Sequence, residues 1–104
     1  MVTVAAAGHY GKPRPAVIVQ TDAFPERNAS VVVCRLTSEL VDAPDFRVTI
    51  VPKSENGLRV TSQVMADKPV TIRRERIGRK IGHLGDQDMA RLNAALAFVL
   101  GLAD

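Results

Sequence analysis

The 104-residue sequence contains one cysteine, two histidines and no tryptophan, and these shortages exclude several kinds of functional site. The single cysteine, Cys34, can form neither an internal disulfide nor a cysteine-rich metal site. His9 and His83 are far apart in the sequence, so we expect no catalytic metal. Because Cys34 follows three consecutive valines, we expect a buried, unreactive thiol.

Long apolar runs are also absent from the sequence. No segment approaches the roughly 20 apolar residues that span a bilayer, and no signal-peptide pattern of a basic region followed by an apolar one is found at the start. We therefore expect a cytoplasmic protein without membrane contact. The glycine-rich loops that bind nucleotides and the nucleophile elbow of serine hydrolases are missing too, so we expect no cofactor.

Aromatic residues make up only 4% of the sequence, whereas 46% of its residues are hydrophobic. A core must therefore consist mainly of valine, isoleucine, leucine and alanine, in a composition typical of a folded protein. The length is sufficient for one domain with one hydrophobic core. We expect a single domain over residues 1–104.

The formal net charge of +3 is unevenly distributed. Residues 73–80 contain five basic side chains and one acidic side chain, a local net charge of +4, which leaves −1 for the rest of the chain. Such a concentration of positive charge favours the binding of a polyanion. The sequence leaves open a second interpretation, a solvated edge strand whose charges prevent aggregation.

Apolar runs and alternating patterns predict a mainly β structure. Lys12-Pro13-Arg14-Pro15 is not expected to form a central strand, because proline lacks the N–H donor that a sheet requires. Arg14 should instead be extended between its two prolines. The predicted strands are 2–7, 16–20, 30–36, 46–50, 60–65, 70–74 and 77–82, with a turn at Glu55-Asn56-Gly57.

The pattern changes near the C-terminus, where apolar residues recur three or four positions apart from Met89 to Val99. This spacing predicts an amphipathic helix with one buried face. Asp86 is the expected N-cap, and Gly101 can adopt the left-handed conformation that ends a helix. Several short strands followed by one helix predict a small, curved antiparallel sheet or barrel with the helix packed on it.

Polar side chains gather at the predicted strand ends and loops, where a rigid scaffold often holds functional groups. By pattern alone they support only a β domain with a polar rim that binds an anion. These residues are His9, Lys12, Arg14, Thr37, Ser38, Gln63 and Asp67.

Four parts of this chain resemble motifs of the MazF/PemK toxins, and they occur in the same order. Residues 11–19 (GKPRPAVIV) are similar to the family's G-x-x-RPA-V-V opening, and residues 33–38 (VCRLTS) to its V-x-P-[IL]-T-S strand end. Residues 62–68 (SQVMADK) resemble its S-x-V-x-x-[DE]-Q segment. Ile77-Gly78 and the closing helix also match in order and spacing.

This resemblance implies the toxin fold shared by the MazF and CcdB families, a homodimer, and metal-independent, sequence-specific cleavage of single-stranded RNA. The 2′-hydroxyl would attack the adjacent phosphodiester and leave a 2′,3′-cyclic phosphate and a 5′-hydroxyl. A cognate antitoxin would block the RNA groove with its C-terminal tail. Met65 stands where some relatives carry arginine, and Lys68 where glutamine is common.

The resemblance also implies catalytic roles for Arg14, Thr37 and Asp67. The planar, always charged guanidinium of Arg14 can bind two phosphate oxygens at once. Thr37 would donate its hydroxyl to the scissile phosphate, and Asp67 would accept a proton. Each residue has a structural alternative: an ion pair with a carboxylate for Arg14, a strand-end cap for Thr37, and pairing with an arginine for Asp67.

Five further residues are candidates for RNA binding. His9 can titrate near neutrality or stack on a base, unless it is an ordinary loop histidine. Tyr10 is its neighbour in the same loop, and Lys12 would hold the RNA backbone. Ser38 and Gln63 would read base edges.

Two other functions are compatible with these residues. A CcdB-like poison would bind DNA gyrase with no chemistry of its own, although that mode does not need the Arg-Pro-Ala and Thr-Ser motifs. A catalytically inactive RNA-binding or repressor subunit would bind RNA and leave it intact.

Overall fold

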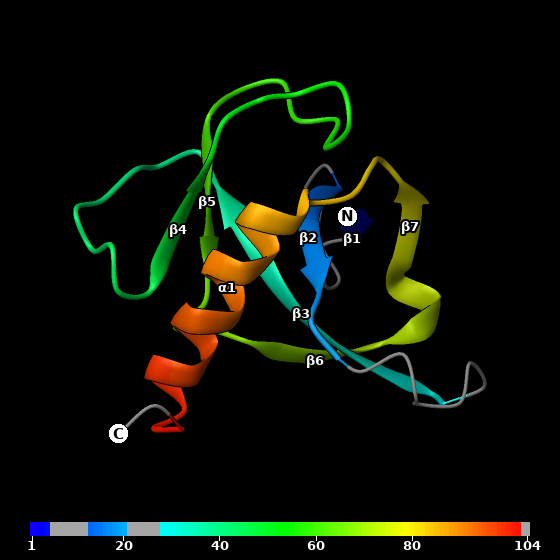
Figure 1. The fold of residues 1–104 in the computed structure, drawn as a ribbon. Coiled ribbons are helices and arrows are strands. Elements are labelled where there is room, and N and C mark those ends of the chain that lie inside the picture. The colour runs from blue at the N-terminus through cyan, green and yellow to red at the C-terminus, as the bar shows by residue number, and fades with distance from the viewer. Residues whose placement is uncertain (5–12, 21–27, 103–104) are drawn as a thin grey trace.

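The computed structural model describes residues 1–4, 13–20 and 28–102, which form one antiparallel sheet and one long helix (Figure 1). This architecture confirms the predicted mainly β fold with a C-terminal helix. The elements are β1 (Val2–Val4), β2 (Arg14–Ile18), β3 (Ser30–Thr37), β4 (Arg47–Ile50), β5 (Ser62–Met65), β6 (Val70–Arg73), the 3₁₀ helix η1 (Arg74–Arg76), β7 (Ile77–Lys80) and α1 (Asp86–Val99).

Strand β3 organises the sheet because both of its edges are paired. On one edge it pairs with β2, with Ala16 opposite Arg35. On the other edge its first half pairs with β6, and its last two residues, Leu36 and Thr37, pair with β5. The strand order β4–β5–β3–β2–β1–β7 places β4 and β7 at the two ends of a curved sheet (Figure 1).

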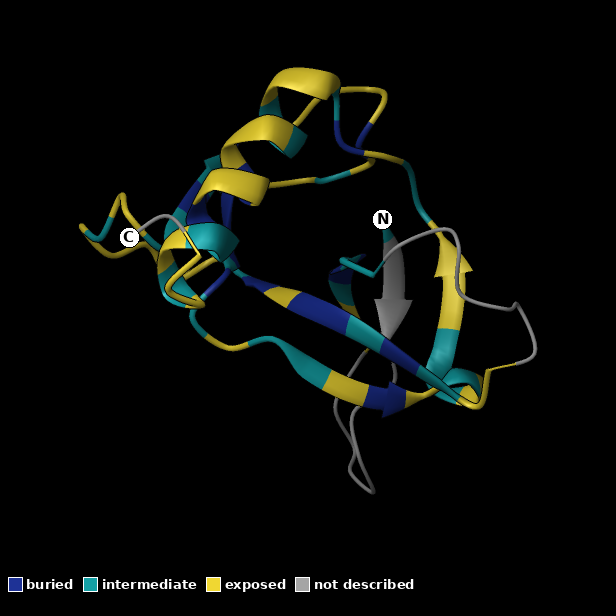
Figure 2. Cartoon of the chain, turned by 60° about the horizontal axis from the view of Figure 1, so that its bottom comes forward, coloured by how far each residue is buried: buried dark blue, intermediate teal, exposed yellow. Residues whose placement is uncertain are grey.

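Successive residues of a strand point to opposite faces of a sheet, so β3 contributes to two hydrophobic clusters. The larger cluster lies under α1 and joins Cys34 of β3 to Leu92 and Ala95 of the helix. Figure 2 shows the burial alternating along the sheet, whereas the outer face of α1 is exposed. The smaller cluster lies on the other face and consists of Ala16, Val31, Val33 and Ile72.

Cys34 is fully buried in the larger cluster, as the sequence predicts. Burial, together with the nearby negative charge of Asp67, raises the pKa of its thiol to about 11. The thiol is therefore protonated near neutrality and is not a nucleophile.

Helix α1 buries the face that the spacing predicts. Leu92 and Ala95 are buried, and Met89 and Leu96 pack against the larger cluster. Gly101, with φ of 73°, follows the helix in the left-handed conformation, which confirms the predicted end.

The predicted N-cap of α1 was wrong by one residue. Gly85 is the N-cap, because its extended backbone precedes the helix and its carbonyl accepts the N–H of Met89 at 2.9 Å. Asp86 is instead the first helical residue. Its charge still lies in the first turn with that of Asp88, where the helix dipole stabilises anions.

The structure confirms that Arg14 is extended and moves the start of this strand from the predicted residue 16 to residue 14. Strand β2 begins at Arg14, so Pro15 lies inside a strand and is paired with Thr3 of β1. The pairing of β2 with β3 covers only Ala16–Ile18. Pro15 therefore has one paired neighbour rather than two, and the start of a strand tolerates the missing N–H donor.

The other strands lie where the sequence predicts them, with ends shifted by one or two residues. Residues 5–7 of the first predicted strand lie outside the described residues. Gly57, with φ of 70°, confirms the turn at Glu55-Asn56-Gly57, whereas the sequence did not predict η1. No helix within the described residues is long and apolar enough to cross a membrane.

Leu92 provides a test of this packing. Its side chain is completely buried, so Leu92→Ala should lower the free energy of unfolding by about 2–5 kcal/mol. Leu102→Ala removes the same atoms from a side chain that is 76% exposed, and it should change the free energy of unfolding by at most about 0.5 kcal/mol. Urea denaturation followed by circular dichroism gives both values, and equal effects would contradict this placement of α1.

Candidate functional site

The register between β2 and β3 determines which polar side chains meet. Ala16 lies opposite Arg35, so two residues further along the antiparallel pair Arg14 comes level with Thr37. Because alternate residues of a strand share a face, these side chains lie on the face that carries the smaller cluster, away from α1.

These side chains line one surface cleft of about 450 Å³. Strand β2 contributes Arg14, the end of β3 and the loop after it contribute residues 35–39, and β5 contributes Met65. Ser38 follows Thr37 in this lining, so three of the predicted site residues, Arg14, Thr37 and Ser38, come together at one place.

Arg14 and Arg35 supply the positive charge of the cleft. Both are exposed, and within the described ranges neither side chain forms a hydrogen bond or an ion pair. The carboxylate partner considered for Arg14 is therefore not found in the part of the chain that the structure describes. Glu39 is the one acid in the lining. Two guanidinium groups without a carboxylate partner are suited to phosphate oxygens.

The hydroxyl of Thr37 is held in place by the backbone. Its Oγ1 accepts a hydrogen bond from the N–H of Glu39 at 3.1 Å, which is the strand-end cap that the sequence suggests. This bond uses a lone pair of the hydroxyl and leaves its proton to be donated elsewhere. The cap and the donation to a phosphate are therefore compatible roles.

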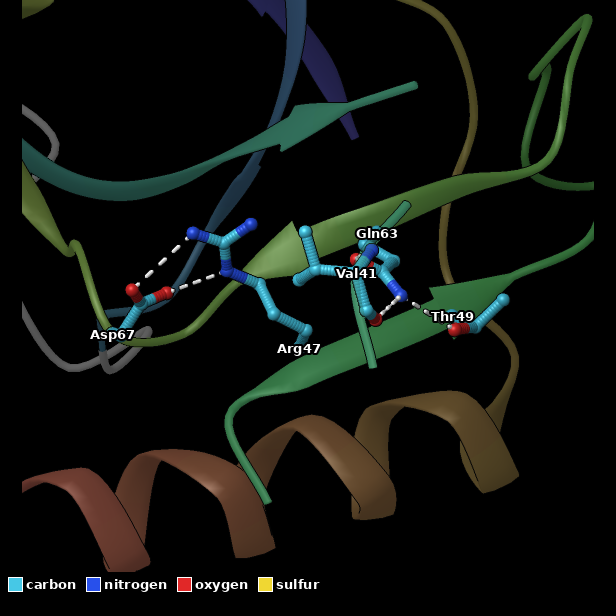
Figure 3. A network of polar contacts seen from close by, with 5 residues as sticks. All are labelled: Val41, Arg47, Thr49, Gln63 and Asp67. Carbon is cyan, nitrogen blue, oxygen red and sulfur yellow. Dashed lines mark hydrogen bonds and ion pairs between the residues drawn. The ribbon is translucent and has the colours of Figure 1, made fainter. Parts of the chain in front are cut away.

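Asp67 does not line this cleft but forms an ion pair with Arg47 (Figure 3). The guanidinium donates from Nε to Oδ1 at 2.9 Å and from Nη2 to Oδ2 at 3.3 Å. These hydrogen bonds from Arg47 hold the pKa of Asp67 below its ordinary value. The geometry favours the structural alternative for Asp67, and its role as a base stays a prediction.

Gln63 is buried, and its amide is engaged within the protein (Figure 3). Its Oε1 accepts the N–H of Val41 at 3.1 Å, and its Nε2 donates to the carbonyl of Val41 at 2.9 Å and to the hydroxyl of Thr49 at 3.2 Å. These bonds attach the loop that follows Thr37 to the sheet. Gln63 thus positions the loop that carries Ser38, and its contact with RNA bases stays a prediction.

The remaining predicted site residues, His9, Tyr10 and Lys12, lie outside the described residues. Among the residues that are described, no group of three or more histidine, cysteine, aspartate or glutamate side chains is arranged to hold a metal ion.

Comparison with known proteins places this chain in a family. The model of the PemK-like, MazF-like toxins of type II toxin–antitoxin systems matches residues 1–100. The chain belongs to this toxin family. The "probable endoribonuclease MazF" of Mycolicibacterium smegmatis is 42% identical to this MazF-like chain over 102 residues, which cover 97% of this chain and 93% of that protein. The endoribonuclease EndoA of Bacillus subtilis is 26% identical over 94 residues, which cover 90% of this chain and 81% of that protein.

Solved structures of MazF toxins share this fold. An endoribonuclease in complex with its cognate antitoxin, from a mycobacterial species, has a TM-score of 0.80 at 30% identity and covers 97% of this chain and 90% of that one. A MazE–MazF complex from Deinococcus radiodurans has a TM-score of 0.69 at 24% identity, with 86% of both chains covered.

Arg35 is the site residue that sequence reasoning missed. In this MazF-like chain it occupies the proline position of the V-x-P-[IL]-T-S motif. A signal was present, since a cation interrupts an otherwise apolar strand two residues before Thr37. Only the register with β2 shows that this cation shares the cleft with Arg14.

The Arg47–Asp67 pair predicts a pH dependence of stability. Because folding lowers the pKa of Asp67 from 3.8, its stabilisation is fully present above that pH and is lost as the pH falls through the folded-state pKa. Asp67→Asn should lower the free energy of unfolding at neutral pH by roughly 1–3 kcal/mol. The difference in unfolding free energy between this variant and the native chain should become smaller below pH 3.8.

Urea denaturation at neutral pH and at about pH 3 measures this dependence. Asp42→Asn changes an exposed carboxylate and is the matched control, with an expected effect of at most about 0.5 kcal/mol at either pH. If Asp67→Asn lowers the free energy of unfolding by the same amount at both pH values, the ion pair does not stabilise the fold.

Proposed function

We propose that this chain is an endoribonuclease toxin that cuts single-stranded RNA without a metal ion. The main support is that the guanidinium of Arg14 and the hydroxyl of Thr37 line the same cleft. Membership in a toxin family whose curated relatives include named endoribonucleases supports the reaction class.

In the proposed reaction the 2′-oxygen of a ribose attacks the adjacent phosphorus. A bond from phosphorus to the 2′-oxygen forms, and the bond from phosphorus to the leaving 5′-oxygen breaks. A base takes the proton of the 2′-hydroxyl, and an acid gives a proton to the 5′-oxygen. The products are a 2′,3′-cyclic phosphate and a 5′-hydroxyl.

The cleft residues stabilise the charge that develops on the phosphorus oxygens. Arg14 binds two of these oxygens, and Thr37 donates its hydroxyl proton to the same phosphate. Arg35, on the next strand, adds a second guanidinium that holds the phosphate or a neighbouring one. Donors aimed in advance at developing charge are worth about 3–4 kcal/mol each.

Proton transfer involves other side chains, because an arginine guanidinium keeps its proton near neutrality and is a poor acid there. Asp67 is the predicted proton acceptor, but its two hydrogen bonds to Arg47 and its lowered pKa make it a weak base. His9 is the alternative, since the ordinary pKa of histidine lies near neutrality.

We further propose that the toxin is a cytoplasmic homodimer that inhibits translation and growth, and that a cognate antitoxin inhibits it by occupying the RNA groove. One solved relative is an endoribonuclease in complex with its cognate antitoxin, and another is a MazE–MazF complex. Tyr10, Lys12 and Ser38 would contact the RNA beside the cut.

Arg14→Ala should reduce cleavage of single-stranded RNA by about 100–1,000-fold. The measurement is a gel assay of the purified protein with end-labelled RNA in excess EDTA, which also tests independence from metal. Arg59→Ala is the matched control, because it removes an exposed arginine from the loop before β5 and should cut like the native chain. Cleavage by Arg14→Ala at the native rate would overturn the assignment of this residue.

The same gel separates the two rival functions. Intact RNA together with inhibition of DNA gyrase would indicate a CcdB-like poison. A retarded but uncut RNA band would indicate a catalytically inactive binding subunit. Mapping the cut ends across total RNA would then identify the cleavage sequence and the target RNA class.

Thr37→Val tests the hydroxyl, because valine keeps the branched shape of threonine and removes the donor. We expect kcat to fall by about 100-fold with little change in KM, since the donation is strongest in the transition state. Thr37→Ser keeps the hydroxyl and should retain most of the activity. Unfolding curves of both variants control for the lost cap to Glu39, and equal activity of the two would leave Thr37 a structural role only.

A further inference from the structure

One acidic residue of the cleft has no role in the proposed reaction. Glu39 lines the cleft beside Thr37, and it is the only acid among the lining residues. The residue is exposed, and its carboxylate forms no hydrogen bond or ion pair with any residue that the structure describes. Both carboxylate oxygens are therefore available to a bound ligand as acceptors.

Hydrogen bonds on both sides hold the backbone of Glu39 in place. Its N–H donates to Thr37 Oγ1 at 3.1 Å, and Gln63 attaches Val41, two residues further on, to the sheet. A glutamate carboxylate extends about 4–6 Å from its own backbone nitrogen. A phosphate oxygen that accepts the hydroxyl of Thr37 lies about 2.7 Å from Oγ1. The carboxylate can therefore reach a ribose beside that phosphate without a movement of the backbone.

The two arginines of the cleft offset the repulsion between this carboxylate and a phosphate. Arg14 and Arg35 are two cations against the one anion of Glu39, so the lining carries a net charge of +1. Neither guanidinium forms an ion pair with Glu39, although all three side chains belong to one cleft. The arginines can therefore bind phosphate while the carboxylate acts on a different group of the RNA.

Asp67, the proton acceptor expected from the sequence, is less suited to that step. It does not line the cleft, and both of its carboxylate oxygens accept hydrogen bonds from Arg47 (Figure 3). A general base must come within about 2.6–3.2 Å of the oxygen that it deprotonates, or act through one water. Among the acids that the structure describes, only Glu39 lines the cleft of Arg14 and Thr37.

We propose that Glu39 is the general base of the cleavage, an inference that rests on the proposed function. Its carboxylate takes the proton of the 2′-hydroxyl while the 2′-oxygen forms its bond to phosphorus, and it becomes a neutral carboxylic acid. The bond from phosphorus to the 5′-oxygen breaks with its electron pair, and the 5′-oxygen takes a proton from the solvent. Glu39 returns its own proton to the solvent before the next turnover.

Glu39→Gln tests this role, because glutamine keeps the size of the side chain and the backbone N–H that bonds to Thr37, but its amide is not a base. Asp42→Asn is the matched control. It removes the same charge from an exposed residue of the same loop between β3 and β4, outside the lining of the cleft. Both variants therefore change the overall attraction to RNA equally.

At neutral pH, Glu39→Gln should lower kcat for single-stranded RNA by about 100–10,000-fold, whereas Asp42→Asn should cut like the native chain. The Kd of 2′-O-methyl RNA, which lacks the attacking hydroxyl, should change by less than about threefold in both variants. Hydroxide replaces a missing base, so the deficit of Glu39→Gln should become at least about tenfold smaller between neutral pH and about pH 9. Glu39→Asp keeps a carboxylate and should cut faster than Glu39→Gln.

Three results would overturn the role of Glu39 and leave the proposed nuclease intact. The first is cleavage by Glu39→Gln at the native rate, or a loss that is the same at every pH, which indicates a distorted cleft. The second is a loss reversed by high pH in Asp67→Asn and not in Glu39→Gln. The third is an unchanged kcat with a different cleavage sequence, because the carboxylate then reads a base. A native chain that leaves RNA intact overturns the nuclease and this role together.

Discussion

The antiparallel register of β2 against β3 is the constraint on which the site depends. Val33 and Cys34 are adjacent in β3 and buried on opposite faces of the sheet, in different clusters. In β2, Val17 and Ala16 are likewise buried in different clusters, so a shift of β2 by one residue would move each of them to the wrong face and would carry Arg14 from the cleft face to the face under α1. Core packing therefore fixes the register, and the register brings Arg14, Arg35 and Thr37 together in one cleft.

The arginines around the cleft have two different roles, and the exposure of each side chain determines which role it has. The side chain of Arg47 is only 13% exposed, so it requires the carboxylate of Asp67, because an unpaired buried charge is costly. Arg14 and Arg35 are exposed and have no side-chain partner among the residues that the structure describes, so water can solvate them and a phosphate can replace that water. The polar contacts of Arg47 and Gln63 in Figure 3 thus support the cleft rather than form it.

Local patterns in the sequence predict the elements of this fold but not the contacts between them. The alternation in β3 and the spacing in α1 are visible within a few residues, and both elements are found where expected. Asp67 and Gln63 were polar residues without visible partners, because those partners lie 20 and 22 positions away. Pro15 placed the predicted start of β2 two residues late, because the sequence does not show that β1 pairs with residues 14 and 15.

The two departures of the cleft from the family motifs offset each other in charge. Met65 stands on β5 where some relatives carry arginine, and Arg35 stands on β3 where the motif has proline. Thr37 of β3 is paired with Gln63 of β5, so Arg35 and Met65 line the same cleft from two adjacent strands. The cleft thereby keeps two guanidinium groups, and only their spacing relative to Thr37 changes. In the proposed reaction the second guanidinium would therefore meet a phosphate at a different spacing from Thr37, with the same total charge in the cleft.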